Sequence, residues 1–314
     1  MENLTADDIE AARGRIARAV RRTPLLHARP VAGRDPGCDL FLKLENLQIA
    51  GSFKARGAAN TVLSLDRASL QRGLVTASGG NHGLGVAAAA QAAQVPAVIH
   101  LSTNATPDKV KRLQAFGAEV VLEGEVWDDA NALALARAAQ DGSTYVHPFA
   151  QPSVIAGQGT VALELLEDLP DVETVVVAIG GGGLISGMAT ALKAKRPKVR
   201  VIGVEAEGAP TLKRSREAGE LVTLEKITSK VATLSPRRSA EINLRIVQEL
   251  VDDIVLVSDA EMKDAARWLW SDFGIGAELA GAAGMAAVLQ RRFSFRPDEK
   301  VGVLVCGAGT DGLS

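Results

Sequence analysis

The feature that most constrains this chain is a regular alternation of short apolar runs, glycine-rich turns and longer helical segments. The apolar runs expected to form strands are 74–77, 97–102, 119–124, 172–180, 199–207 and 300–309. Strands that alternate with helices of roughly 10–15 residues form βαβ units on a parallel sheet. The sequence therefore predicts an α/β protein, and its 314 residues are enough for two lobes.

The alternation occurs in two stretches, with a change near residue 150. We expect residues 1–72 and 151–314 to form a large ligand-binding lobe and residues 73–150 a small mobile lobe. Ligands commonly bind in clefts between such units. The predicted architecture is thus two open parallel-sheet α/β lobes with the site in the cleft between them.

Charge and composition exclude several classes of protein. The chain has 35 Lys and Arg against 37 Asp and Glu, a formal net charge of −2, so we expect neither nucleic acid nor a membrane surface as partner. There is no signal peptide and no apolar run long enough to span a membrane. Two distant cysteines, Cys38 and Cys306, form no zinc motif or disulfide framework. We expect a cytoplasmic protein with a small-molecule substrate.

Three glycine-rich turns, 78–85, 180–187 and 306–309, each follow an expected strand. Ligands of open α/β sheets bind at the carboxyl ends of the strands, where these turns lie. The run Gly180–Gly183 leaves backbone N–H groups open in front of a helix, which suits a phosphate group. A purely conformational role explains one glycine pair, but it explains four consecutive glycines poorly.

Two nucleotide-binding motifs are the alternatives for the same turn. A P-loop is excluded because no Lys-Ser/Thr pair follows the glycines. A dinucleotide fingerprint is the rival, since Gly181 and Gly183 match its first positions and Glu205 lies about 20 residues further on. Its third glycine position falls on Ser186, so the fingerprint is incomplete. A dinucleotide-binding oxidoreductase is therefore the alternative from a different class.

The segment 45–60, ENLQIAGSFKARGAAN, carries the reactive group. Ser52 is a suitable N-cap residue, which places Lys54 in the first turn of a helix. The positive end of the helix dipole should lower the pKa of Lys54 and help to supply the neutral amine that a Schiff base requires. Phe53 offers a flat apolar surface beside it.

Six motifs occur in order along the chain: RRTPLL (21–26), KLENLQIAGSFKARGA (43–58), SGGNHGLGVA (78–87), HPF with VIAGQGT (147–160), GGGGLISG (180–187) and CGAG (306–309). In this combination the chain resembles the serine/threonine dehydratase (threonine ammonia-lyase) family. These are pyridoxal-phosphate enzymes of fold type II, the fold of the tryptophan-synthase β-subunit. The resemblance covers essentially the whole chain. It implies a homodimer that eliminates water and ammonia from a β-hydroxy amino acid, such as L-threonine or L-serine, to give a 2-oxo acid.

The resemblance also implies residue roles. Lys54 would hold the cofactor as a Schiff base and remove the α-proton, Phe53 would pack on the ring, and Asn81 would contact the ring hydroxyl. Cys306 would face the pyridine nitrogen. The phosphate of the cofactor would be bound by the backbone amides of Gly180, Gly181, Gly182, Gly183 and Leu184. The carboxylate of the substrate would be bound by the turn that contains Ser78, Gly79, Asn81 and His82. We expect the His82 side chain to orient this turn through a hydrogen bond and not to transfer a proton.

The sequence departs from its relatives at several points. Serine racemases carry a serine where this chain has Gly79, so we do not expect racemisation. Relatives that bind a divalent cation have two carboxylates, and here Glu205 matches the first while Thr211 replaces the second. A metal at Glu205 is thus left open but not expected.

The stretch 228–243 also departs from the Ala-Asp-Gly sequence typical of threonine dehydratases. The substrate therefore stays open, with dehydratases for 3-phenylserine or 3-hydroxyaspartate and a serine racemase as alternatives. Since the sequence ends soon after Cys306, we expect no C-terminal regulatory domain.

Overall fold

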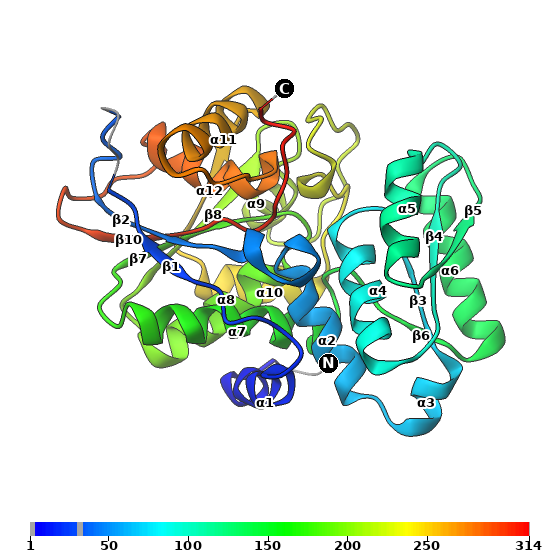
Figure 1. The fold of residues 1–314 in the computed structure, drawn as a ribbon. Coiled ribbons are helices and arrows are strands. Elements are labelled where there is room, and N and C mark those ends of the chain that lie inside the picture. Colours follow the sequence, from blue (N-terminus) through cyan, green and yellow to red (C-terminus); the bar gives the residue numbers. More distant parts are fainter. Residues whose placement is uncertain (1–3, 30–33, 314) are drawn as a thin grey trace.

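The protein is described here by a computed structural model that covers residues 4–29 and 34–313. The described residues form two open β-sheets, each covered by helices (Figure 1). The larger sheet has the strand order β1-β2-β10-β7-β8-β9 and the smaller sheet the order β5-β4-β3-β6. All neighbouring strands are parallel except the pair β1 and β2. The predicted α/β fold with parallel sheets is confirmed.

The strands of the larger sheet are β1 Leu25–His27, β2 Asp39–Lys43, β7 Thr174–Ala178, β8 Arg200–Ala206, β9 Asp253–Val257 and β10 Lys300–Leu304. Those of the smaller sheet are β3 Leu74–Ala77, β4 Ala97–Leu101, β5 Glu119–Leu122 and β6 Thr144–Tyr145. The smaller sheet thus lies within residues 73–150. The lobe boundaries themselves stay a prediction.

The α-helices that accompany the larger sheet are α1 Ala6–Ile16, α7 Pro152–Asp168, α8 Gly183–Lys195, α9 Thr211–Ala218, α10 Glu241–Leu250, α11 Asp259–Phe273 and α12 Leu279–Leu289. The other α-helices are α2 Lys54–Ser64, α3 Arg67–Arg72, α4 Asn81–Ala93, α5 Pro107–Ala115 and α6 Trp127–Asp141. Three short 3₁₀ helices are η1 Glu45–Leu47, η2 Ile49–Gly51 and η3 Ala232–Leu234. None of the described helices has the length and hydropathy needed to cross a membrane.

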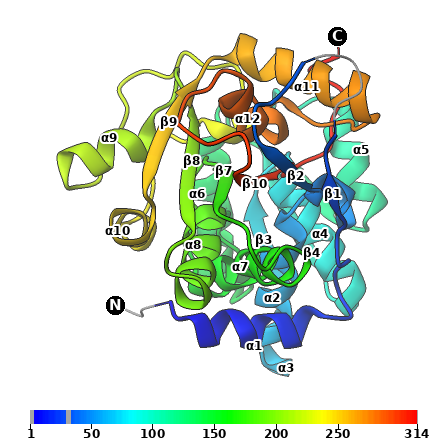
Figure 2. The same cartoon turned by 90° about the vertical axis from the view of Figure 1, so that its left-hand side faces the viewer.

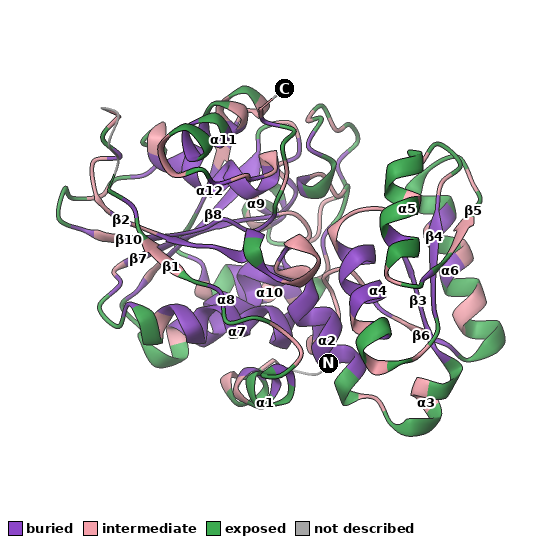
Figure 3. Ribbon diagram, in the orientation of Figure 1, coloured by how far each residue is buried: buried purple, intermediate pink, exposed green. Residues whose placement is uncertain are grey.

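The larger sheet forms the middle layer of its lobe. Helices α11 and α12 cover one face, and α7, α8 and α10 cover the other (Figures 1 and 2). Every residue of β7 is buried, as expected for a parallel strand covered on both faces. Figure 3 shows the buried residues concentrated in this sheet and in the helices packed directly on it. The strand predicted at 172–180 is therefore the centre of the core.

Helix α2 lies between the two lobes and packs against α4 on one side and α7 on the other. Glycines allow these close contacts. A Cβ atom at Gly157 would lie 2.6 Å from the Arg56 carbonyl oxygen, and one at Gly57 would lie 2.7 Å from the Val154 carbonyl oxygen. On the other side, a Cβ at Gly85 would lie 3.1 Å from the Lys54 carbonyl oxygen. Helix α2, with Lys54 as its first residue, is thus held in a fixed position.

A buried ion cluster fixes the same helix. The Arg56 guanidinium, 1% exposed, donates hydrogen bonds to Glu45 at 2.6 and 2.8 Å and to Glu164 at 2.7 and 2.9 Å. The fully buried Lys43 ammonium lies 2.8 Å from Glu164. Both carboxylates therefore have cationic partners, which a buried charge requires.

We predict that Arg56→Ala lowers the free energy of unfolding by about 3–5 kcal/mol, because it leaves two buried carboxylates without their main partner. The matched control is Arg296→Ala. Arg296 is a mostly exposed arginine that pairs with Glu173 at 2.6 Å, and removing it should cost less than about 1 kcal/mol. Chemical denaturation of both variants measures the difference, and equal losses would show that the cluster does not stabilise α2.

Candidate active site

Two of the glycine-rich turns lie side by side. Strands β7 and β10 are parallel neighbours, with Val301 paired to Thr174 and Val303 paired to Val176. Their carboxyl ends therefore lie at the same edge of the sheet. Gly180–Gly183 follow β7, and Cys306 follows β10. The structure thus brings together two segments that are more than 100 residues apart in sequence.

The start of α2 is attached to the same edge by backbone pairing. The Phe53 N–H donates to the Cys306 carbonyl at 3.2 Å, the Ala308 N–H donates to the Gly51 carbonyl at 2.8 Å, and Ser52 forms an antiparallel bridge with Gly307. The helix begins at Lys54 with Phe53 as N-cap. The prediction of Ser52 as N-cap is therefore wrong, and the Ser52 side chain makes no capping hydrogen bond to the helix. The Ser52 hydroxyl is buried and has no hydrogen-bond partner among the described residues.

The Lys54 side chain reaches the junction between the two lobes. Its ammonium donates to the Pro148 carbonyl at 2.6 Å and lies 5.3 Å from the centroid of the Phe53 ring. Burial lowers the pKa of Lys54 to about 8, although the nearby carboxylate of Glu278 acts in the opposite direction. The direction agrees with the predicted lowering, and burial is its largest cause. The neutral amine is therefore accessible near physiological pH.

The Gly180–Gly183 turn cannot carry side chains. A Cβ at Gly181 would lie 2.2 Å from the Phe149 ring, one at Gly183 would lie 2.7 Å from the Phe149 carbonyl, and one at Gly180 would lie 2.7 Å from the Thr233 carbonyl. Gly182 has φ +96°, a conformation that favours glycine. Helix α8 begins directly behind the turn and has no side-chain cap. Its N-terminal amides are thus suited to bind an anion.

Two side chains that the sequence did not single out hold this turn in place. Asn243 in α10 donates to the Gly181 carbonyl at 2.8 Å and to the Phe149 carbonyl at 3.1 Å. Ser239 also donates to the Gly181 carbonyl, at 2.9 Å. Both bonds hold the Gly181 carbonyl, so the turn is fixed against α10 and the segment before it. Both residues lie in the stretch 228–243, which departs from the sequence typical of threonine dehydratases, but no motif marks either one, since both act across a separation of about 60 residues.

Asn81 is the first residue of α4, on the side of the small sheet. Its side-chain amide donates to the Glu278 carboxylate at 2.6 Å. Glu278 precedes α12 on the large sheet, so this bond joins the two lobes. Sequence reasoning missed Glu278 because a single acidic residue between helices carries no motif.

The His82 side chain is buried against β3 and the residue that follows β6. It is 3% exposed, and its Nε2 lies 2.9 Å from the Val146 carbonyl and 3.1 Å from the Thr76 hydroxyl. Burial lowers the pKa of His82 to about 3, so the ring is neutral at physiological pH. This arrangement supports the orienting role. A substrate contact by His82 would have to come from its backbone N–H.

Ser78 and Gly79 form the rest of the predicted carboxylate turn. The Gly80 N–H donates to the Ser78 hydroxyl at 3.3 Å, which closes the turn locally. The Ser78 carbonyl lies against α4, where a Cβ at Gly83 would be 1.9 Å from it. The roles of these residues in binding a substrate stay predictions.

The Glu205 carboxylate binds backbone N–H groups, whereas a metal site would require it to face a cation. Its fully buried carboxylate accepts hydrogen bonds from the N–H groups of Leu212 and Lys213 at 2.8 and 2.9 Å, at the start of α9. The Thr211 hydroxyl donates to the Pro236 carbonyl at 2.7 Å. Within residues 4–29 and 34–313, no group of three or more His, Cys, Asp or Glu residues could hold a metal ion. These residues do not fit a divalent-cation site.

We therefore predict that a chelator leaves the activity within about twofold of the untreated enzyme and that added Mg²⁺ or Ca²⁺ restores nothing, since hard cations require several oxygen ligands. Assays with and without chelator test this. A several-fold loss that metal reverses would contradict the prediction.

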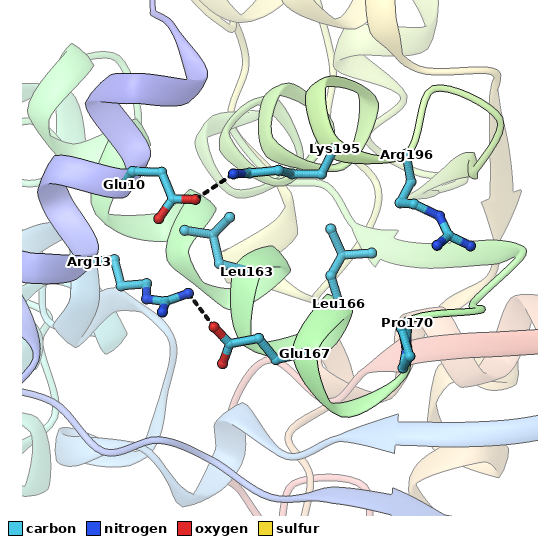
Figure 4. A pocket seen from close by; sticks show the side chains of 8 residues that line it. All are labelled: Glu10, Arg13, Leu163, Leu166, Glu167, Pro170, Lys195 and Arg196. Atoms are coloured by element: carbon cyan, nitrogen blue, oxygen red, sulfur yellow. Dashed lines mark hydrogen bonds and ion pairs between the residues drawn. The ribbon is translucent and has the colours of Figure 1, made fainter.

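A surface pocket of about 260 Å³ lies at the opposite end of α8 from the glycine turn (Figure 4). Its walls come from α1, α7 and α8, and Lys195 pairs with Glu10 across it at 2.8 Å. Within the pocket, Arg13 also pairs with Glu167. The pocket lies between α1, α7 and α8 and is not part of the candidate site.

Comparison with known proteins agrees with the geometry of the site. The sequence profile of the family described as pyridoxal-phosphate dependent enzyme matches residues 16–307. The chain belongs to this family. It is 40% identical over 308 residues to the L-threonine ammonia-lyase of Thermotoga maritima, an alignment that covers 98% of this chain and 76% of that protein.

Solved structures of pyridoxal-phosphate enzymes resemble the whole chain. Maize serine racemase superposes with a TM-score of 0.93 at 34% identity, and the alignment covers 99% of this chain and 95% of the racemase chain. The processed form of threonine deaminase isoform 2 from Solanum lycopersicum gives a TM-score of 0.92 at 33% identity, with 98% and 84% covered. The predicted fold type II and the predicted cofactor are thus confirmed.

The residues present fit pyridoxal phosphate. The cofactor needs an amine for covalent attachment, an anion site for its phosphate and an apolar surface for its ring. Lys54 supplies the amine, the turn in front of α8 forms a cradle that Cβ atoms would fill, and Phe53 lies beside the amine. Assigning these individual residues to the cofactor is a proposal.

We predict that Lys54→Ala abolishes both turnover and covalent trapping of the cofactor by borohydride, because no other described lysine begins a helix at this edge of the sheet. The far-ultraviolet circular dichroism should stay unchanged. Mass mapping of the trapped peptide in the unmodified protein gives the decisive result, and a cofactor adduct at any other lysine would overturn the assignment.

Proposed function

We propose that this protein is a pyridoxal-phosphate dependent ammonia-lyase that converts a small β-hydroxy amino acid, such as L-threonine or L-serine, to a 2-oxo acid and ammonia. The observation that carries the proposal is the convergence of the Lys54 amine, the Cys306 thiol and the Gly180–Gly183 turn at one edge of the sheet. Relatives named threonine ammonia-lyase support it. The homodimer and the cytoplasmic location stay predictions.

When bound, the cofactor supplies a conjugated ring that accepts electrons from the α-carbon of the substrate. The protein would bind its phosphate through the amides of Gly180–Gly183 and Leu184, at the positive end of α8. Phe53 would pack against its ring, and Asn81 would donate a hydrogen bond to its ring hydroxyl. These contacts orient the reacting carbon toward Lys54.

Cys306 is the residue that would face the ring nitrogen of the cofactor. Its thiol is buried and donates to the Ala280 carbonyl at 3.5 Å. Burial raises the pKa of Cys306 far above its usual range, so the thiol stays neutral. A neutral partner there would not stabilise a protonated ring nitrogen as a carboxylate would, so the ring would be a weaker electron acceptor. This favours rapid loss of a β substituent over a long-lived carbanion.

Lys54 would then act as the base. Its neutral amine, made accessible by the lowered pKa, would remove the α-proton of the substrate. The electron pair of that C–H bond forms the α,β double bond, and the β-hydroxyl leaves as water after protonation. The released enamine tautomerises, and its hydrolysis gives the 2-oxo acid and ammonia.

Racemisation would need a second acid or base on the opposite face of the substrate. Gly79 offers no side chain there, and the space beside it is already filled. A Cβ at Gly79 would lie 3.2 Å from Leu101 Cδ2 and 3.4 Å from Lys109 Cδ. A positioned acid or base contributes about 10²–10⁴-fold to such a step, so an unassisted step should be slow. This favours elimination over racemisation.

A panel of β-hydroxy amino acids tests the proposed function. We expect 2-oxo acid release from L-serine or L-threonine, with D-serine formed at least about 100-fold more slowly than pyruvate, since the second proton transfer lacks a catalyst. Chiral chromatography after incubation with L-serine measures both products. Reaction with 3-phenylserine or 3-hydroxyaspartate alone would change the substrate assignment, and D-serine at a rate near that of pyruvate would disprove the interpretation of Gly79.

A further inference from the structure

The position of Glu278 before α12 is explained by its contacts with the candidate site and not by capping of the helix. It directly precedes α12, and its backbone N–H donates to the Gly307 carbonyl at 3.1 Å. The first amide of α12, that of Leu279, donates to the Asp311 carboxylate at 3.2 Å. Asp311 thus accepts from the first amide of the helix, and the Glu278 side chain makes no capping hydrogen bond.

The Glu278 carboxylate reaches Asn81 across the two lobes. The distance between Asn81 Nδ2 and Glu278 Oε1 is 2.6 Å. Gly307 makes room for the contact, since a Cβ there would lie 2.2 Å from Glu278 Oε1 and 3.2 Å from Asn81 Nδ2. The glycine that follows Cys306 therefore allows a bond that no side chain at that position would permit.

The chemistry of the pair fixes the orientation of the Asn81 amide. A carboxylate only accepts hydrogen bonds, so it binds the nitrogen end of the amide and leaves the second N–H for another acceptor. A protonated carboxyl both donates and accepts, so it can bind either end of the amide. Only the charged form of Glu278 selects a single orientation.

Groups from several elements face Glu278. Burial raises the pKa of Glu278 to about 7, and the Asp311 charge acts in the same direction. The Asn81 hydrogen bond and the cations Arg112 in α5 and Lys54 in α2 act in the opposite direction. The neighbouring Cys306 thiol is neutral. Glu278 is therefore charged above about pH 7 and becomes protonated as the pH falls below that value.

We propose that Glu278 is a positioning residue whose carboxylate holds the Asn81 amide across the two lobes, with one N–H directed to the ring hydroxyl of the cofactor. The inference depends on the cofactor and on the predicted contact of Asn81, and it does not require a particular substrate. Protonation of Glu278 releases the amide, so the environment of the bound cofactor changes with pH.

The experiment follows the visible absorbance of the holoenzyme from about pH 5 to about pH 9, together with the dissociation constant of the cofactor. In the unmodified protein we expect a spectral transition near pH 7, the pKa of Glu278. Glu278→Gln keeps the size of the side chain but can donate as well as accept, like the protonated acid. It should lack the transition, resemble the low-pH form throughout and bind the cofactor roughly 5–10-fold more weakly above the transition.

Glu205→Gln is the matched control. Glu205 is a second buried carboxyl whose pKa burial raises to about 7, but it binds the start of α9 and does not contact the site. This variant should keep the transition of the unmodified protein. If Glu278→Gln does not fold, Asn81→Ala serves in its place and should also lose the transition, because Glu278 acts through Asn81.

A transition that persists in Glu278→Gln, or one that Glu205→Gln also removes, would overturn the proposal. Persistence in Asn81→Ala would overturn it as well. These spectra contain no substrate, so they separate this inference from the proposed lyase activity. A protein that shows the Glu278-dependent transition but releases no 2-oxo acid would disprove only the proposed activity.

Discussion

The structure of the site depends on one short backbone pairing, between residues 51–53 and 306–308. These bonds attach the start of α2 to the extension of β10, so Lys54 and Cys306 cannot move independently. Since β10 is also the neighbour of β7, the same pairing sets the distance from Lys54 to the glycine turn. Backbone pairing is well suited to this purpose, because its geometry does not depend on flexible side chains.

Helix α2 must be held rigidly for this arrangement to be useful, and two kinds of contact achieve that. Close helix packing through Gly57, Gly85 and Gly157 fixes its distance from α4 and α7. The buried pairing of Arg56 with Glu45 and Glu164 fixes its rotation. A catalytic amine benefits from such support because small displacements of a reacting group reduce rates strongly.

Burial acts on three titratable groups of the site in a common direction, toward the neutral form. It lowers the pKa of Lys54 to about 8, raises that of Glu278 to about 7 and raises that of Cys306 far above its usual range. A neutral amine is the form that attacks a carbonyl or removes a proton. In the proposed assignment, a neutral thiol at Cys306 would leave the cofactor ring without a counter-charge. The proposed site would therefore combine an active base with a moderate electron acceptor.

The sequence by itself determined the α/β fold, the strand at 172–180, the glycine turn and the position of Lys54 in a first helical turn. These features could be predicted because each depends on residues that are close together in the sequence, such as the period of a strand or helix, the glycines of a turn or a lysine beside a helix start. Only the tertiary structure decided the N-cap at Phe53, the inward direction of His82, the use of Glu205 as a cap for α9 and the bond from Glu278 to Asn81. Each of these depends on which backbone or side-chain group the packed fold brings within hydrogen-bonding distance, and Asn81 and Glu278 are 197 residues apart. Local sequence patterns specify elements, whereas the partners of a buried polar group are fixed only when the elements pack.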